Sequence, residues 1–450
     1  MAKDNKTHNE GSTHGASSGT SATEKPVGLT LPWAEPVWHY STSPYYNDSH
    51  KKLQAYARNF IDENIIPDAL EWEAAGDCPE SVKEAWFKSG MVLLEVPSQY
   101  RPPGFKTLAG IPVDQLDEFH HLVLTDEISR VEGGVTVALS GANTIGIPPI
   151  IYHGTEEQKQ RWLPGLFTRE TNFCLGITEP SGGSDVGNIK TTATRSADGS
   201  HYVVSGTKKW ITGSQWATHM TTAVRTGGPG AGGISLLVVP LASPGISITK
   251  IPNSGQNAGG ASWVRMEGVR VPRDHLLGDE NQGFKYVMTN FNRERFVLAV
   301  TCNRKARTCL STALAYARER ETFGRPLVHR QIIRHKITTL AREVEAHWAW
   351  LEQIAYQVQV DGWRNDALAG RIALAKVSGG RLVELAAREA QQIMGGVAYQ
   401  RGGPGGGGRV EQITRDLRML VVGGGSEEIL GDLAFKEETK QERKRSVAKL

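Results

Sequence analysis

Glycine and hydroxyl residues crowd one short segment that could contact a ligand. Residues 174–185 read CLGITEPSGGSD, a strand-like run that opens into a loop with two glycines and two serines. Glycine lacks a Cβ, so its backbone can approach a ligand closely. Backbone N–H groups and hydroxyls in such a loop suit phosphate or pyrophosphate oxygens. Taken alone, such a segment is more often an ordinary Ser/Gly turn, so the prediction needs a second motif.

That second motif follows about 25 residues later, where an aromatic residue and a hydroxyl residue lie on another predicted strand. The residues are Lys209-Trp210-Ile211-Thr212-Gly213. A flat cofactor needs a ring to pack against and a short polar side chain that reaches its edge. The two motifs together therefore indicate a site for a planar, phosphate-bearing cofactor.

The order of these motifs resembles the middle domain of acyl-CoA dehydrogenases. Downstream segments continue the resemblance: RETFGRPLVHRQ at 320–331, QIMGG at 392–396, Arg415-Asp416, and GSEEI at 425–429. Together they span roughly residues 48–436. The resemblance implies an α+β fold with an N-terminal helical domain, a middle β-barrel domain and a C-terminal four-helix bundle. It also implies FAD as cofactor and an acyl-CoA thioester as substrate.

The implied reaction is α,β-dehydrogenation to a trans-2-enoyl-CoA. In this family a carboxylate removes the α-proton, and the β-hydrogen leaves as hydride to flavin N5. The base must have a pKa raised by burial, while the flavin supplies the redox chemistry.

Two positions compete for the base. Many relatives place a glutamate just before the C-terminal Gly-Thr, but here that position is Gly424. Isovaleryl- and long-chain-type relatives instead carry the base early in the C-terminal domain, in a Glu-Arg context. Glu294-Arg295 matches that context, so the resemblance assigns Glu294 as the catalytic base. The alternatives are that Glu294 is a surface residue in a helical ion pair, or that Glu427 or Glu428 acts instead.

A helix through this segment is expected to place Phe291, Val297 and Leu298 on one face, with Glu294 pointing sideways into a cleft.

The resemblance also assigns binding residues. Residues that match the FAD contacts are Leu175, Ile177, Thr178, Ser184, Trp210, Ile211, Thr212, Arg320, Thr322, Gln331, Gln392, Gly395, Gly396, Ser426 and Glu428. Those from Arg320 to Gly396 would reach the FAD of a neighbouring subunit, which implies a homotetramer or homodimer. Leu175 and Arg330 depart from the residues common in relatives, which implies altered flavin contacts.

Residues that match the acyl-CoA contacts are Ser184, Asn292, Arg293, Arg295 and Gly424. Asn292 stands where many relatives have aspartate, which leaves that contact in doubt. Cys174 is expected to be a small buried residue and not a nucleophile.

The patterning changes twice along the chain. Residues 48–170 carry apolar residues at helical spacing in 50–64 and 80–91, with a proline-rich loop at 97–116 and a short helix at 156–166 that Pro164-Gly165 stops. Residues 171–280 have strand character at 201–205, 234–240, 246–251 and 262–266, and Asp198-Gly199 predicts a hairpin turn. Residues 281–436 return to helices, the clearest from Ile333 to Val358.

Composition excludes several classes of protein. The chain has 450 residues, 39% of them hydrophobic, and a net charge of +3 with acids and bases interspersed. A nucleic-acid partner is not expected, because no basic stripe is present, and neither is a membrane span, because no run of about 18 apolar residues occurs. Four cysteines without zinc spacing predict no metal and a reducing compartment.

The two ends differ from the middle. Residues 1–30 are polar and are expected to be a disordered tail without a signal peptide or mitochondrial leader. Residues 437–450 form a basic tail that ends in Ala448-Lys449-Leu450, a variant of the Ser-Lys-Leu address that the peroxisomal import receptor reads. A peroxisomal location is therefore expected if the source is eukaryotic, and a cytoplasmic one otherwise. The alternative for this end is a frayed basic tail.

Three functions remain open on the sequence. The first is an acyl-CoA dehydrogenase that passes electrons to an electron-transfer flavoprotein, in fatty-acid oxidation or in fungal secondary metabolism. The second is a flavin oxidase of the acyl-CoA or nitroalkane type, which uses oxygen as acceptor. The third is a non-catalytic flavin- or acyl-CoA-binding protein, which loss of the base would favour.

Overall fold

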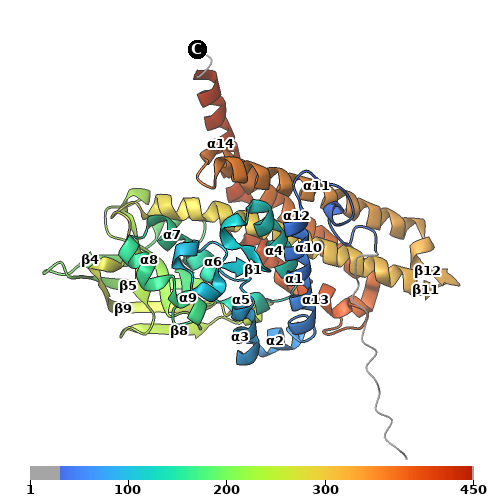
Figure 1. Ribbon diagram of the computed structural model, residues 1–450, viewed down its shortest axis with the longest axis horizontal. Helices are drawn as coiled ribbons and strands as arrows, with labels where there is room; N and C mark the ends of the chain where they lie inside the picture. Colours follow the sequence, from blue (N-terminus) through green and yellow to red (C-terminus); the bar gives the residue numbers. More distant parts are fainter. Residues whose placement is uncertain (1–30, 448–450) are drawn as a thin grey trace, which may run out of the picture.

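The computed structural model describes residues 31–447, so the predicted disordered N-terminal tail and the tripeptide 448–450 lie outside the described residues. In chain order, the protein consists of a helical region, a sheet-rich region and a second helical region (Figure 1). This arrangement confirms the predicted fold class. The sheet lies at one end of the molecule, and the long C-terminal helices run from it to the other end.

The N-terminal helical region is built from short helices around one apolar core. The helices are α1 (Asp48–Asn64), α2 (Ala69–Ala75), α3 (Glu80–Lys88), α4 (Glu118–Ile128), α5 (Val135–Ser140), α6 (Asn143–Gly146), α7 (Pro148–His153), α8 (Glu156–Trp162) and α9 (Gly165–Thr168). The predicted loop at 97–116 contains the hairpin β1 (Thr107–Leu108) and β2 (Ile111–Pro112). Pro164 ends the helix predicted at 156–166, as expected, but it also begins α9, because proline is tolerated at a helix N-terminus.

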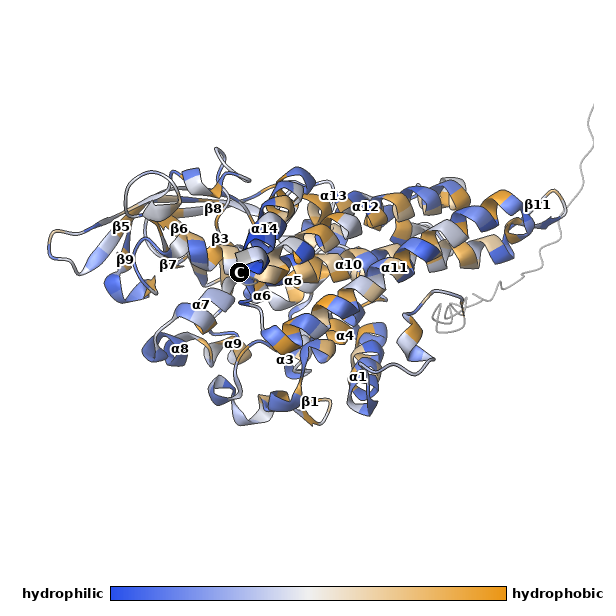
Figure 2. Ribbon diagram, turned by 90° about the horizontal axis from the view of Figure 1, so that it is seen from above, coloured by the Kyte–Doolittle hydropathy of each residue, from blue (hydrophilic) through white to orange (hydrophobic). Residues whose placement is uncertain are grey.

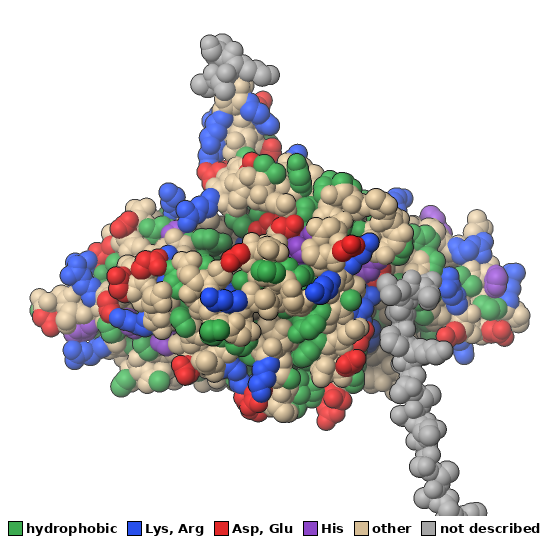
Figure 3. All heavy atoms as spheres, in the orientation of Figure 1, with side chains coloured by type: hydrophobic (Ala, Val, Ile, Leu, Met, Phe, Trp, Pro, Cys, Tyr) green, Lys and Arg blue, Asp and Glu red, His purple; other side chains and the backbone are tan. Residues whose placement is uncertain are grey.

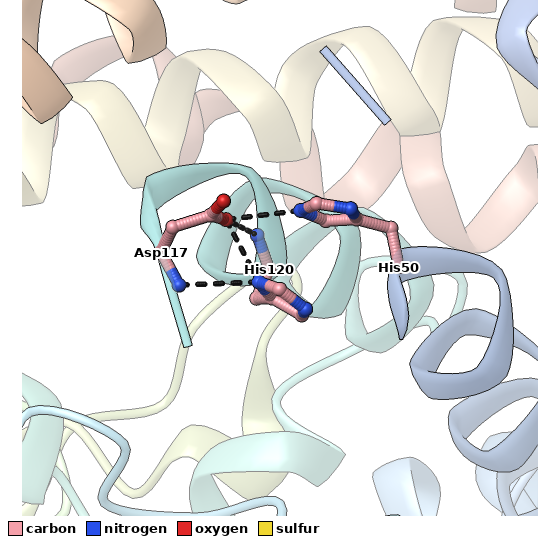
Figure 4. A group of neighbouring side chains, drawn as sticks. All are labelled: His50, Asp117 and His120. Atoms are coloured by element: carbon pink, nitrogen blue, oxygen red, sulfur yellow. Dashed lines mark hydrogen bonds and ion pairs between the residues drawn. The ribbon is translucent and has the colours of Figure 1, made fainter. Parts of the chain in front are cut away.

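Two histidines fasten α1 to α4 at their N-termini. Each helix begins with a capping box, Asn47 with His50 in α1 and Asp117 with His120 in α4. His50 Nε2 lies 2.9 Å from Asp117 Oδ1, and the two imidazole rings stack with centroids 3.8 Å apart (Figure 4). The two imidazoles and the Asp117 carboxylate are groups that can bind a metal ion. Helix capping and the hydrogen bond between α1 and α4 already account for their contacts.

The middle region is one sheet of eight strands. They are β3 (Phe173–Gly176), β4 (Thr192–Arg195), β5 (His201–Ile211), β6 (His219–Arg225), β7 (Ile234–Pro240), β8 (Ile246–Lys250), β9 (Ser262–Pro272) and β10 (Leu276–Leu277). The order is β10-β7-β6-β4-β5-β9-β8, with β3 parallel to β6. The ladder has two ends, β10 and β8, whereas a barrel requires a closed ring of strands. The predicted β-barrel domain therefore takes the form of one sheet whose ladder is not closed by hydrogen bonds.

The predicted turn at Asp198-Gly199 is confirmed, because β4 and β5 pair antiparallel on either side of it. Strand β6 was missed because its threonines interrupt the apolar pattern. Thr221 and Thr222 are nevertheless fully buried, and the Thr221 hydroxyl donates to the Gly146 carbonyl over 2.7 Å. The polarity of these threonines therefore concealed a buried strand from the sequence pattern.

The C-terminal region is a bundle of four helices with a fifth added. The helices are α10 (Gly283–Glu319), α11 (Gln331–Asp361), α12 (Ala369–Met394), α13 (Gly407–Val422) and α14 (Glu427–Val447), and the hairpin β11 (Glu321–Thr322) and β12 (Arg325–Pro326) joins α10 to α11. Figure 2 shows apolar and polar faces along these helices. The C-terminal end of α14 projects from the body (Figure 1).

Close contact between helices explains a glycine in the middle of α12. A Cβ at Gly379 would lie 3.0 Å from His347 Cε1 and 3.1 Å from Cys302 Cβ. The glycine therefore lets α10, α11 and α12 cross closely. All four cysteines are free and buried, including Cys174.

Eleven short 3-10 helices connect these elements in the described part of the chain: η1 (Val37–His39), η2 (Ser98–Tyr100), η3 (Pro103–Phe105), η4 (Val113–Gln115), η5 (Val186–Asn188), η6 (Ala231–Gly233), η7 (Asn257–Gly259), η8 (Arg273–His275), η9 (Leu327–His329), η10 (Asp366–Leu368) and η11 (Gly395–Ala398).

A buried ion network joins the helical regions. Arg304 of α10 donates to Glu35, which precedes α1, over 3.0 Å and to Asp126 of α4 over 2.8 Å. Arg58 of α1 also pairs with Glu35, at 2.9 Å. Because all these groups are largely buried, each charge depends on its partners.

Within residues 31–447, no helix combines the length and the apolar character that crossing a membrane requires. On the face drawn in Figure 3, acidic and basic side chains are interspersed.

Candidate active site

Glu294 is the residue that the sequence predicts to be the catalytic base. Its Oε2 atom is buried and has no hydrogen-bond partner. Burial raises the pKa of Glu294 to about 7, although the nearby charges of Arg295 and Lys376 lower it. A carboxyl group with such a pKa is partly ionised at neutral pH and can accept a proton. The geometry therefore gives Glu294 the properties of a general base.

The predicted orientation of this helix was partly wrong. Phe291, Glu294 and Leu298 follow the spacing i, i+3 and i+7, so Glu294 shares their face of α10. Val297, one turn beyond Glu294, is 38% exposed, so it does not belong to the buried face as predicted. Loss of solvation on burial is the physical cause of the raised pKa of Glu294.

The turn between α13 and α14 lies beside Glu294. Arg295 Nε donates to the Gly424 carbonyl over 2.9 Å, and Lys376 Nζ donates to the Gly425 carbonyl over 3.0 Å. Gly424 has φ +67°, and a Cβ there would lie 3.1 Å from Leu298 Cδ1. The two positions that could supply a base in this family therefore meet here, but only Glu294 carries a carboxylate.

The rival glutamates have different surroundings. Glu427 forms an ion pair with Arg381, with a 3.0 Å contact between Arg381 Nε and Glu427 Oε2, and this hydrogen bond lowers the pKa of Glu427. Glu428 is exposed in the first turn of α14. The lowered pKa makes Glu427 a poor proton acceptor, and Glu428 lies in water instead of in a buried site. Both residues are therefore weaker candidates for the base than Glu294. Ser426, a predicted FAD contact, lies half-buried just before α14.

The predicted aromatic platform is exposed at the end of β5. A bulge shifts the β5–β9 register between Lys208 and Ile211, and Trp210 within it has φ +64° and is 49% exposed. Lys209 Nζ lies 4.8 Å from the ring centroid of Trp210 and 4.6 Å from that of Trp263. Thr212 is half-buried, whereas the Ile211 side chain is buried. The bulge therefore exposes the indole ring of Trp210 to a cofactor. Ile211 could contact a cofactor only through its backbone.

The glycine loop opens from the neighbouring strand. Thr178 accepts a hydrogen bond from Lys209 N at its carbonyl over 2.9 Å, which places the two predicted motifs side by side. Leu175 and Ile177 are buried in the core, so a cofactor could meet only their backbone. Gly183 and Ser184 are exposed, and the nearest atom to a Cβ at Gly183 is Thr178 Cγ2 at 3.9 Å.

A buried ion pair holds this loop in place. Lys208 Nζ donates to Glu179 over 2.8 Å and to the Ile177 carbonyl over 3.1 Å, and the Glu179 carboxylate accepts from the backbone N–H groups of Lys190 and Thr191. An exposed ring, hydroxyls and an open glycine loop on a fixed support fit a planar cofactor with phosphates.

The remaining predicted FAD contacts lie at the far end of the bundle. Arg320 is exposed at the end of α10, and Arg330 donates to the Thr322 carbonyl over 2.8 Å, which fixes the hairpin. Gln331 begins α11, and Gln392, Gly395 and Gly396 are exposed at the end of α12. An ion pair between Lys336 and Glu389 joins these ends of α11 and α12. The structure therefore brings these residues to one end, away from Glu294.

The predicted CoA contacts near Glu294 have partners within the protein. Asn292 accepts from Arg295 over 3.2 Å, and both residues are buried. The Arg293 guanidinium lies 3.3 Å from His121 Nδ1 and 3.8 Å from Glu95. These contacts direct Arg293 toward the N-terminal helices, and they give Arg295 the role of holding the turn. The assignment of these residues to the nucleotide end of CoA stays a prediction.

A cavity of about 540 Å³ lies between α2, the loop at 253–257 and α13. Its lining includes Glu71, Asn253, Arg401 and Arg415, and it contains none of the predicted site residues. It is therefore separate from the site around Glu294 and Trp210.

Comparisons with known proteins define the family. The family models for the N-terminal, middle and C-terminal domains of acyl-CoA dehydrogenases match residues 47–170, 174–269 and 281–437. Acyl-CoA dehydrogenase apdG of Emericella nidulans is 40% identical over 419 residues, which cover 91% of this chain and 95% of that protein. Acyl-CoA dehydrogenase AFT10-1 of Alternaria alternata is 40% identical over 427 residues, which cover 92% and 97%.

The fold agrees with these matches. The crystal structure of a probable acyl-CoA dehydrogenase from Mycobacterium abscessus superposes with a TM-score of 0.77 at 34% identity, over 87% of this chain and 99% of that one. The chain belongs to the acyl-CoA dehydrogenase family. It is an oxidoreductase with FAD as cofactor, as the sequence motifs predicted.

Sequence reasoning missed one residue of the site. Lys376 is buried in α12 and reaches the turn beside Glu294. The signal was present, because a single lysine interrupts the apolar run Ala373-Leu-Ala-Lys-Val377. A lone charge on a buried helical face requires a partner, but the sequence does not name it.

Proposed function

We propose that the protein dehydrogenates an acyl-CoA thioester between Cα and Cβ, with Glu294 as the base that removes the α-proton. The observation that carries this proposal is the buried Glu294 Oε2, which has no hydrogen-bond partner and belongs to a carboxyl with a pKa of about 7. Such a group is poised to take a proton near neutral pH. The product is a trans-2-enoyl-CoA.

FAD, when bound, accepts the β-hydrogen as a hydride. Trp210 and Thr212 would pack against the flavin ring, and Thr178 would reach its edge. Ser184, exposed in the glycine loop, would contact the cofactor or the thioester. The exposed indole ring and the open space at Gly183 support this assignment.

A second copy of the chain would complete the cofactor site. Glu294 and Arg320 are 26 residues apart on the continuous helix α10, which at 1.5 Å per residue is about 39 Å. One dinucleotide does not span that distance within one chain. The exposed Arg320, Gln331 and Gln392 would therefore reach the FAD of a partner, in a homodimer or homotetramer.

We also propose a peroxisomal location if the source is eukaryotic. Helix α14 projects from the body and leads into the sequence Ala448-Lys449-Leu450, which lies outside the described residues (Figure 1). The import receptor would bind this end. A peroxisomal enzyme could pass its electrons to oxygen, so an oxidase is the second candidate beside a dehydrogenase that uses an electron-transfer flavoprotein.

The physiological substrate is proposed to be an acyl intermediate of fungal secondary metabolism or of fatty-acid oxidation. The two relatives at 40% identity are named acyl-CoA dehydrogenases and come from fungi, which supports an acyl-CoA substrate and a fungal source. Both assignments rest on similarity and on the chemistry of the site.

Anaerobic mixing of the FAD-loaded protein with short, branched and long acyl-CoAs tests the reaction. The proposal predicts that one class bleaches the oxidised flavin absorbance and yields the enoyl-CoA by mass spectrometry. Bleaching by nitroalkanes alone, or by no compound, would contradict it. Admitting oxygen afterwards separates an oxidase, which reoxidises rapidly, from a dehydrogenase.

A further inference from the structure

Lys376 is a buried lysine at the junction of three helices. Its side chain on α12 is only 1% exposed, and Nζ donates to the carbonyl oxygens of Val421 and Gly425. A buried ammonium group is costly unless it is hydrogen-bonded, so these two carbonyls account for its presence in the core. Burial lowers the pKa of Lys376 to about 8, and at neutral pH most of the group remains charged.

The two carbonyls belong to the end of α13 and to the turn that follows it. The carbonyl end of a helix carries a partial negative charge, which a cation stabilises. Arg295 of α10 binds the same turn at Gly424, over 2.9 Å. Arg295 therefore fixes this turn to α10 and Lys376 fixes it to α12, next to Glu294.

The charges that face Glu294 are few. Arg295 and Lys376 both stabilise its ionised form. Lys376 is also influenced by the thiol of Cys302 and by Glu427, which is paired with Arg381. Arg295 is adjacent in sequence and stays on α10, so Lys376 is the cation that another helix contributes to the base.

We propose that Lys376 is a positioning residue, which ties the 421–425 turn to α12 and keeps the Glu294 carboxyl able to accept a proton at neutral pH. This inference rests on the proposed function, in which Glu294 is the base. A purely structural role would make Lys376 a helix cap and nothing more. The two roles differ in whether the pH dependence of the reaction changes when the charge is removed.

The test compares Lys376→Met, Lys376→Arg and the control Lys305→Met. Lys305 is also a buried lysine that donates to a backbone carbonyl, that of Val131, but it lies on α10 eleven residues beyond Glu294. Single-turnover flavin reduction by the substrate is measured across pH. Lys376→Met is expected to move the midpoint to higher pH by on the order of one unit. It is also expected to lower the rate constant of flavin reduction at neutral pH, with little change in the Kd of the substrate.

Lys376→Arg is expected to keep the midpoint, because it keeps the charge. Lys305→Met is expected to lower Tm without moving the midpoint. A wild-type midpoint in Lys376→Met, with only a lower Tm, would overturn the proposal. If Lys376→Met does not fold, Lys376→Gln takes its place, with the same expectation and the same contradicting result.

A second measurement does not involve the flavin. The difference in unfolding free energy between the parent and its Glu294→Gln variant, followed over pH, reports the titration of Glu294. This titration is expected to move to higher pH in the Lys376→Met background, and an unmoved titration would also overturn the proposal. Failure of the proposed function looks different, because Glu294→Gln alone would then reduce the flavin at the wild-type rate.

Discussion

Arg295 Nε donates to the carbonyl oxygen of Gly424 over 2.9 Å, so the residue beside the candidate base holds the position where many relatives carry theirs. Glu294 and Gly424 are far apart in sequence but belong to one small site. In this chain the carboxylate lies on α10, and residues 423–425 of the facing turn are all glycine.

A glutamate introduced at position 424 is not expected to replace Glu294 as the base. A glutamate at this position would have to adopt φ +67° and would place its Cβ 3.1 Å from Leu298 Cδ1. Strain of this kind costs about 1–3 kcal/mol. The double variant Glu294→Gly/Gly424→Glu should therefore lose stability and leave flavin reduction unrestored in stopped-flow measurements.

The matched control for that experiment is Gly104→Ala, because a Cβ at Gly104 meets no atom within 4 Å. It should leave Tm nearly unchanged. Wild-type rates in the double variant would show that the turn can adapt and that the packing argument is wrong.

The ionised form of Glu294 should destabilise the fold. Its pKa rises from 4.5 to about 7 on folding, so its contribution is fully favourable below the unfolded value and is lost as the pH rises through about 7. The free energy of unfolding of Glu294→Gln, relative to wild type, should therefore rise by about 2 to 3 kcal/mol between about pH 4 and about pH 8.

Chemical denaturation at a series of pH values measures this gain. Glu442→Gln, an exposed residue of α14, serves as the control and should show no such trend. A pH-independent difference for Glu294→Gln would mean that the carboxyl has an ordinary pKa, which would remove the main support for its role as base.

The buried ion network should be sensitive to the loss of one partner. Arg304→Met would leave the carboxylates of Glu35 and Asp126 buried with fewer partners, at a cost of about 3–5 kcal/mol. Arg342→Met, which removes an exposed pair with Glu343, should cost no more than about 0.5 kcal/mol. Urea unfolding measures both, and equal values would contradict the account.

Much of the fold could be predicted from the sequence, because the periodic signals are local. The spacing of Ile337, Val344 and Leu351 predicts the buried face of α11, and Asp198-Gly199 predicts the hairpin of β4 and β5. Strand β6 could not be predicted in this way, because Thr221 is buried through a tertiary hydrogen bond to Gly146. The open ladder of the sheet is likewise set by long-range pairing.

The candidate site was predictable to the level of residue type but not of orientation. The Glu-Arg pair marked Glu294, and its neighbours on α10 followed only from the helix geometry. Lys376 was missed because its partners, the carbonyls of Val421 and Gly425, are backbone atoms that no side-chain pattern reveals. Leu175 and Ile177 matched a motif, yet burial leaves them only backbone contacts.

If two chains share each FAD site, inactive variants should complement each other. Trp210→Ala removes the ring platform, and Arg320→Ala removes the contact from the partner. Each variant should be inactive alone, whereas random mixing in a dimer should restore about a quarter of the sites, because half of the dimers are mixed and each of these has one intact site. Activity and bound flavin after co-refolding measure this, and no recovery would argue against a shared site.

The role of Glu294 is the central claim, and its most direct test is the rate of flavin reduction in a single anaerobic turnover. Wild type and Glu294→Gln are loaded with FAD and mixed with the acyl-CoA that bleaches wild type. If Glu294 is the base, Glu294→Gln is expected to bind the substrate but to reduce the flavin about 10²–10⁴-fold more slowly. Reduction within a few-fold of the wild-type rate would show that another group removes the α-proton.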